Sequence, residues 1–180
     1  MTRDEHIKFL LEKAYKLGFE YERDLRGCSQ CALAAVYDTL DIWDERVFKS
    51  STGFAGGGGL TGMSVCGGYA AGVMVISQLY GRERSNFSDP ERLRFKNFKL
   101  VERFTKQFID ELHSIICRDI HAQIFDRPYF IADSDEYRKF EEAGGHVDKC
   151  TGVVGKASKV IVKFILDEGL VKLPLPGHEE

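Results

Sequence analysis

The sequence predicts an all-α fold, a single-domain helical bundle over residues 1–180 with a buried central helix rich in glycine and alanine. Three observations support this prediction. Apolar residues recur at helical spacing in several segments, no alternating pattern is long enough to build a sheet, and residues 50–81 carry no charge at all. A chain of 180 residues can bury a core without help from disulfides or metals.

The first part of the chain predicts three helices. Residues 4–18 form the first, and Gly18 is expected to end it. Residues 19–27 are rich in Glu, Arg and Asp, which predicts a solvated connection or a frayed extension of that helix. Residues 28–40 return to helical spacing, and residues 44–51 are a shorter helix candidate.

The charge-free run contains the predicted central helix, residues 65–79. Half of the eighteen glycines fall between Gly53 and Gly72, and Gly68 with Gly72 forms a GxxxG pattern. The apolar part of this run is shorter than the roughly 20 residues that a membrane helix needs, and it contains polar side chains. We therefore expect no membrane span and favour a helix buried in the domain, whose small residues let its neighbours approach closely.

The second half predicts four helices. Residues 91–112 form a long basic amphipathic helix, residues 117–125 and 135–143 form short helices, and residues 149–168 form the last one, closed by Gly169. The apolar side chains expected to face inward from the long helix are Phe95, Phe98, Val101, Phe104, Phe108 and Leu112.

The composition points to a globular protein of reducing compartments. With 43% apolar residues, 29% charged residues and a net charge of −3, nucleic acid is not an expected partner, because phosphate binding requires a basic excess. The first residues are charged and do not read as a signal peptide, so we expect a cytoplasmic location. In that setting the five cysteines indicate reactive thiols or metal ligands. The sequence does not identify the redox partner, and it allows a homo-oligomer.

Four predicted helix starts carry a cysteine. Cys28 and Cys31 form a CxxC in the first turn of one helix, and Cys66 follows a glycine loop. Cys117 comes shortly after Ser114 and Cys150 shortly after Asp148, both of which could cap a helix. Unpaired N–H groups and the positive end of the helix dipole favour a thiolate, so lowered thiol pKa values are expected here. The alternative for each cysteine is a small inert core residue.

Three histidines stand four residues from a cysteine. His113 and His121 flank Cys117, and His146 precedes Cys150. If the intervening segments are helical, each pair shares a face, and the imidazole could act as a base or a co-ligand. A surface histidine is the simpler interpretation of each.

The glycine run formally matches a nucleotide-binding pattern, which makes Gly57, Gly58 and Gly59 candidate cofactor-binding residues. No predicted strand leads into the run, however, and no GK[ST] follows it. A tight loop at positive φ that passes close to Cys66 is the favoured interpretation.

Several short motifs together resemble the C_GCAxxG_C_C family of redox-active proteins, over about residues 27–169. The matching features are Cys28-Ser29-Gln30, Gly53-Phe54-Ala55-Gly56-Gly57-Gly58, Cys66-Gly67-Gly68, Leu79-Tyr80-Gly81, Cys117-Arg118 and Cys150. The resemblance implies a small helical protein with four family cysteines, whereas Cys31 is an extra thiol where the family usually has alanine. A related domain resembles part of the split-Soret cytochromes, which carry an iron–sulfur cluster.

The leading hypothesis is a redox protein whose cysteines gather at one end of the bundle. In one version Cys28, Cys66, Cys117 and Cys150 bind an iron–sulfur cluster and the protein transfers electrons. In the other, thiol–disulfide exchange uses Cys28 as the attacking thiolate and Cys31 as its partner, which would make the protein an oxidoreductase. The alternative is a non-enzymatic, metal-stabilised helical interaction module, although a structural zinc site usually shows two close ligand pairs and this chain has one.

Overall fold

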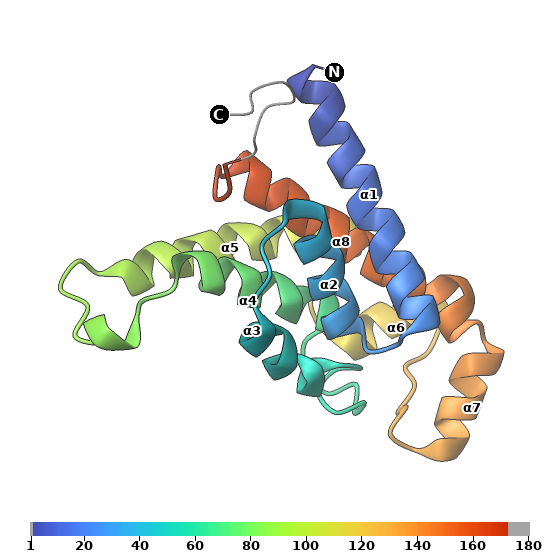
Figure 1. Ribbon diagram of the computed structural model, residues 1–180. Coiled ribbons are helices and arrows are strands. Elements are labelled where there is room, and N and C mark those ends of the chain that lie inside the picture. Colours follow the sequence, from blue (N-terminus) through green and yellow to red (C-terminus); the bar gives the residue numbers. More distant parts are fainter. Residues whose placement is uncertain (1, 173–180) are drawn as a thin grey trace.

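Helices make up the fold, as predicted (Figure 1). The computed structural model describes residues 2–172, which contain eight α-helices and no β-strand. The helices are α1 (Arg3–Asp24), α2 (Cys28–Leu40), α3 (Glu45–Ser50), α4 (Gly67–Tyr80), α5 (Leu93–Leu112), α6 (Cys117–Phe125), α7 (Ser134–Glu142) and α8 (Cys150–Asp167). A π-helical turn, Gly145–Lys149, leads directly into α8. None of these helices is long and apolar enough to cross a membrane.

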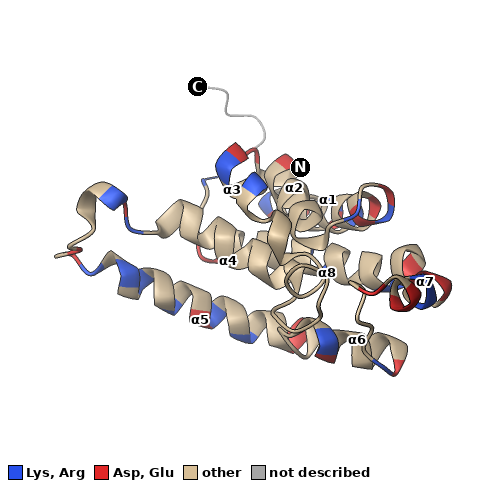
Figure 2. Cartoon of the chain, turned by 90° about the horizontal axis from the view of Figure 1, so that it is seen from below, with Lys and Arg blue, Asp and Glu red and all other residues tan. Residues whose placement is uncertain are grey.

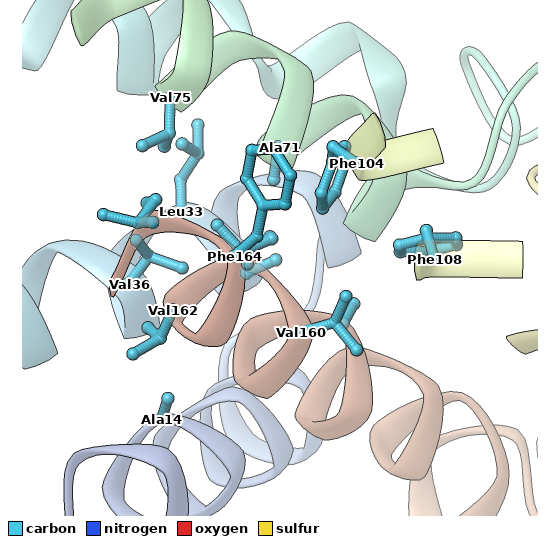
Figure 3. Close-up of a cluster of buried hydrophobic side chains, with 14 of the residues drawn as sticks. Ala14, Leu33, Val36, Ala71, Val75, Phe104, Phe108, Val160, Val162 and Phe164 are labelled. Atoms are coloured by element: carbon cyan, nitrogen blue, oxygen red, sulfur yellow. The ribbon is translucent and has the colours of Figure 1, made fainter. Parts of the chain in front are cut away.

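The core forms around α8, which packs against α1, α2, α4 and α5. Figure 3 shows the side chains that meet there, with Leu33 and Val36 from α2 and Phe164 from α8 among them. The α4 helix is buried along most of its length, which confirms the predicted Gly/Ala-rich central helix, and it shares the centre with α8. The structure starts this helix at Gly67, two residues later than expected.

Small residues on α4 allow this close packing. A side chain at Gly68 would collide with Ala157 of α8, and one at Gly72 would collide with the ring of Phe104 on α5. Both neighbours are fully buried. The GxxxG pattern therefore serves helix packing inside the domain.

The first helix is longer than predicted. The α1 helix continues through Gly18 to Asp24, so Gly18 does not end it. Gly18 is buried, and a side chain there would collide with Ser158 of α8. The glycine is required for a close helix crossing, which a periodicity argument cannot distinguish from a stop. The extension also carries Glu22 into the interior, where it is 3% exposed.

The inward face of α5 differs from the prediction. Phe104, Phe108 and Leu112 are buried as expected, whereas Phe95 is 40% and Phe98 is 59% exposed. The first turns of α5 lie near an arm, residues 81–92, that projects beyond the other helices (Figure 1). There Asn97 is buried and donates to the Ser77 hydroxyl of α4, while Phe95 and Phe98 point away from the core. Lys and Arg residues recur along α5, while α4 carries none (Figure 2).

Short helices complete the fold, and their ends lie within one residue of the predicted ranges. Asp44 caps α3 by accepting hydrogen bonds from the N–H groups of Arg46 and Val47, and Asp133 caps α7 in the same way. The α7 helix packs through Phe140, which forms a second apolar cluster with Tyr129 and Ile131. This second cluster and the main core lie on two sides of a cavity.

Candidate functional site

A cavity of about 170 Å³ lies where the two apolar clusters meet, and Cys28, Cys66, Cys117 and Cys150 all line it. We call it the thiol cavity. Its apolar wall includes Leu60, Ile120, Ile131, Phe140, Val153 and Val154. Five further ionisable side chains line it: Glu22, Arg26, His121, Tyr137 and His146. The chain thus brings together thiols that are far apart in sequence.

Each of the four cysteines stands at a helix start. Cys28, Cys117 and Cys150 are the first residues of α2, α6 and α8, and Cys66 is the N-cap residue of α4. The predicted capping side chains differ from expectation. Ile116, rather than Ser114, precedes α6 directly, and Asp148 lies within the π-helical turn before α8.

An isolated antiparallel bridge positions two of the cysteines. Val65 pairs with Ile116. The N–H of Cys66 donates to the Ile115 carbonyl at 2.7 Å, and the N–H of Cys117 donates to the Ser64 carbonyl at 3.1 Å. The two helices α4 and α6 therefore start side by side, and their first thiols face the same cavity.

The glycine loop packs against two of the cysteines that line the cavity. Gly56, Gly57, Gly58 and Gly59 all have positive φ, between 56° and 81°, as predicted. The N–H of Gly56 donates to the Cys28 sulfur at 3.4 Å. A Cβ on Gly57 would lie 2.7 Å from the Cβ of Cys117. The loop thus approaches Cys28 and Cys117 closely, and it lines the same cavity as Cys66 through Gly56.

One comparison with known proteins bears on this arrangement. The family described as "Putative redox-active protein (C_GCAxxG_C_C)" matches residues 27–164, well over half of the chain. The chain belongs to the C_GCAxxG_C_C family. No curated protein and no solved structure matches the chain.

The glycines in the family's loop region contact protein groups. Gly57 packs against Cys117 and Gly58 packs near Ser64, while Gly59 has no neighbour within 4 Å of an added Cβ. None of Gly57, Gly58 and Gly59 lines the thiol cavity, and no strand leads into the loop. The loop's geometry matches a tight turn beside the cysteines.

The non-family cysteine, Cys31, lies outside the thiol cavity. Its thiol donates to the Arg26 carbonyl at 3.1 Å and lies beside Glu22. The expectation that Cys31 points to the same cavity as Cys28 is therefore wrong. Cys28 lines the cavity, whereas the hydrogen bond to Arg26 holds the Cys31 thiol away from it.

One of the three candidate histidines contacts family cysteines. The Nε2 atom of His121 lies 3.5 Å from the Cys150 sulfur and 3.9 Å from the Cys117 sulfur. Its ring stacks on Phe140, and burial lowers its pKa to about 4, so the imidazole is neutral at pH 7. His146 lines the cavity but faces the carboxylates of Glu22 and Glu141, and His113 is the C-cap residue of α5.

Burial reverses the expected effect on the family thiols. Desolvation raises the pKa of Cys117 to about 12, and it also raises the pKa values of Cys28, Cys66 and Cys150. The helix-start N–H groups of Gly68 and Tyr69 oppose this at Cys66, and the loop N–H of Gly56 opposes it at Cys28, but the effect of desolvation is larger. The prediction of lowered thiol pKa values is therefore wrong, because sequence shows the helix start but not the depth of burial.

The geometry does not converge on a single metal ion. Within residues 2–172, no group of three or more Cys, His, Asp or Glu side chains is close enough to hold one ion. A zinc ion needs four ligands at about 2.0–2.3 Å from one point. The four thiols instead line different parts of the wall of one cavity.

Sequence reasoning missed Glu22, which lines the cavity and has one carboxylate oxygen, Oε2, without a hydrogen-bond partner. It stands in a charged run, residues 19–27, in which nothing distinguishes a buried acid from its exposed neighbours. One signal could have indicated burial: Glu22 follows Leu10, Ala14 and Gly18 at four-residue spacing, which places it on the buried face of α1.

Proposed function

We propose that the protein binds an iron–sulfur cluster through Cys28, Cys66, Cys117 and Cys150 and serves in electron transfer. One observation carries the proposal: four family cysteines, each at a helix start, line one cavity. A bound cluster would supply reversible one-electron chemistry. The residues of this chain would supply the ligands and the environment.

The burial of the thiols favours ligation over exchange. Thiol–disulfide exchange needs an accessible thiolate, whereas Cys66 and Cys117 are buried and desolvation raises the pKa values of all four family thiols. Ligation removes that obstacle, because metal binding displaces the thiol proton and compensates the thiolate charge.

The surrounding groups would tune the reduction potential. The Gly56 N–H points at the Cys28 sulfur, and the N–H groups of Gly68 and Tyr69 point at Cys66. Hydrogen bonds to ligand sulfurs and a water-poor environment are two of the factors that set the potential of a cluster. The apolar wall around the cavity would limit the access of water.

A second candidate function is a dithiol/disulfide couple between Cys117 and Cys150. The position of His121 supports it, since the neutral imidazole lies within 3.9 Å of both sulfurs and could accept a thiol proton. In this version the dithiol loses two electrons and two protons to an oxidised partner as the sulfur–sulfur bond forms. The proposal in either form includes a cytoplasmic location, where thiols stay reduced, and a redox partner.

Anaerobic purification, followed by reconstitution with iron and sulfide, tests the proposal. We expect visible absorption bands, iron and acid-labile sulfide in similar amounts, and a reversible one-electron couple. A colourless, metal-free protein with a two-electron dithiol couple supports the second candidate. Zinc alone, without any couple, overturns both and supports a metal-stabilised interaction module.

A further inference from the structure

Beside the thiol cavity, a buried carboxylate connects with the surface through one histidine. Glu22 lies inside α1's buried face, and its side chain is 5% exposed. The Nε2 atom of His146 lies 3.6 Å from Oε1 of Glu22, and the Nδ1 atom of His146 lies 2.7 Å from Oε1 of Glu141. The Glu141 side chain is 29% exposed and also pairs with Arg26. These groups form a continuous series from the cavity to solvent.

The local backbone holds His146 in this place. His146 has non-helical φ and ψ within the π-helical turn, and Gly144 before it has φ of 87°. A side chain at Gly145 would collide with the Phe140 ring, which also packs edge-on against the His146 imidazole at 5.1 Å. π-helical insertions of this kind often occur at functional sites. The turn aims both ring nitrogens at carboxylates.

We propose that Glu22 takes up and releases the proton that accompanies electron transfer at the four-cysteine site, and that His146 and Glu141 carry this proton between Glu22 and solvent. The inference rests on the proposed function and deepens it. When the site gains one electron from a donor, the Glu22 carboxylate gains one proton from solvent. When the electron leaves to an acceptor, the proton returns by the same route.

Three features of Glu22 support this role. Oε2 is buried and has no hydrogen-bond partner, so it can hold a proton without breaking a bond. The carboxylate lines the cavity, where added negative charge is poorly screened. Burial raises the pKa of Glu22 to about 7, against smaller lowering effects from Cys31 and Arg26, so it can change protonation near neutral pH.

The groups that face Glu22 come from every neighbouring element. Arg26 follows α1, Cys28 and Cys31 lie on α2, Tyr137 on α7 and His146 in the π-helical turn. Cys66 and Cys150 face it across the cavity. Arg26 is the only permanent cation in this set, and it already pairs with Glu141. Added negative charge in the cavity is therefore best balanced by a proton.

The first test uses the cluster-free protein. Infrared difference spectra recorded across a pH titration follow the C=O stretch of a protonated carboxyl group. In the wild type we expect this band below pH 7 and expect it to disappear as the pH rises through about 7. It should be missing from Glu22→Gln at every pH. Glu12→Gln, which changes an exposed acid of the same helix, should behave like the wild type. A wild-type protein without such a band overturns the role of Glu22.

The second test measures the midpoint potential of the reconstituted protein against pH. One proton per electron shifts the potential by about 59 mV for each tenfold change in proton concentration. We expect this slope near neutral pH in the wild type and Glu12→Gln, and a nearly flat line in Glu22→Gln. Redox-difference infrared spectra of the wild type should show the carboxyl band on reduction, which keeps the test valid even if Glu22→Gln folds poorly.

The third test concerns the route. In His146→Gln we expect the pH slope to remain while proton uptake after rapid reduction slows by at least about tenfold. An unchanged rate overturns the path through His146. A reversible couple whose potential is independent of pH overturns the proton coupling but leaves the proposed function intact, whereas a wild type without any reversible one-electron couple overturns both.

Discussion

Cys66 and Cys117 are joined through their backbones by two hydrogen bonds of an antiparallel bridge, Cys66 N–H to Ile115 carbonyl and Cys117 N–H to Ser64 carbonyl. These cysteines are far apart in sequence, and neither of the helices that they start depends on the bridge for its own hydrogen bonds. The bridge aligns two helix starts so that both thiols face one cavity. It makes the thiol cavity a feature of the fold before any metal binds.

This arrangement predicts equal effects from removing either thiol. Cys66→Ser and Cys117→Ser should each lower the iron content after reconstitution by more than about tenfold, because loss of a direct ligand should weaken binding at least as much as loss of an outer group, which typically lowers metal affinity 10–100-fold. Iron and sulfide analysis together with visible absorption measures this. Cys31→Ser is the matched control, since Cys31 is buried on the same helix as Cys28 but lies outside the cavity, and it should load iron normally. Loss of the cluster in Cys31→Ser would contradict the assignment of the four ligands.

A methyl group at Gly67 should displace Cys28. A Cβ there would collide with the Cys28 sulfur and lie 2.8 Å from the Ser29 nitrogen. We expect Gly67→Ala to lower the free energy of unfolding by about 1–3 kcal/mol through overpacking and to reduce iron loading. Urea unfolding of the cluster-free protein measures the first effect.

The control for this substitution is Gly152→Ala. Gly152 lies within α8, and an added Cβ meets nothing within 4 Å. Alanine should raise the free energy of unfolding there by about 0.5–1 kcal/mol, because it restricts the unfolded chain. If Gly67→Ala and Gly152→Ala change the free energy of unfolding alike, the close contact between Gly67 and Cys28 does not destabilise Gly67→Ala.

Local signals in the sequence predicted most helices correctly. The range 28–40 for α2 agrees with the structure, because Gly27 and the polar residues around Asp41 mark both ends and the apolar spacing between them is regular. The gathering of the four family cysteines also followed from the motifs. Gly18 was assigned wrongly because its partner, Ser158, stands on a helix far away in sequence, and only that contact distinguishes close packing from a helix end.

The electrostatics of the site could not be predicted from the sequence. A helix start is a local feature that favours a thiolate, whereas desolvation depends on every segment that closes the cavity. At Cys117 desolvation is the larger effect, so the pKa of the thiol is raised. The burial of Glu22 is also not predictable from local sequence, because it results from the packing of α1 against α2 and α8.

The register of α5 gives a prediction about its phenylalanines. Phe104 is fully buried against Tyr69, Phe108 and Phe164, while Phe98 is 59% exposed. Phe104→Ala should lower the free energy of unfolding by about 3–5 kcal/mol. Phe98→Ala, on the same helix, should stay within about 0.5 kcal/mol of the wild type. Chemical unfolding measures both. A large loss of unfolding free energy in Phe98→Ala would mean that Phe98 is buried, as the sequence pattern predicted.

The buried carboxylate predicts how stability depends on pH in the cluster-free protein. Folding raises the pKa of Glu22 from 4.5 to about 7, so the folded state binds the proton more tightly than the unfolded state does. Its contribution to stability is complete below about pH 4.5, falls as the pH rises and is lost above about pH 7. This pKa difference corresponds to about 3 kcal/mol.

Glu22→Gln removes this dependence, because glutamine does not titrate. We therefore expect the stability of Glu22→Gln relative to the wild type to increase by about 3 kcal/mol between pH 4.5 and pH 8, as measured by urea unfolding at each pH. Other groups titrate in both proteins and cancel in this difference. Glu12→Gln, which changes an exposed carboxylate on α1, should show a constant difference over the same range. A difference for Glu22→Gln that is also constant would mean that Glu22 is ionised throughout, and the proton on which the proposed relay depends would then have no place in the folded protein.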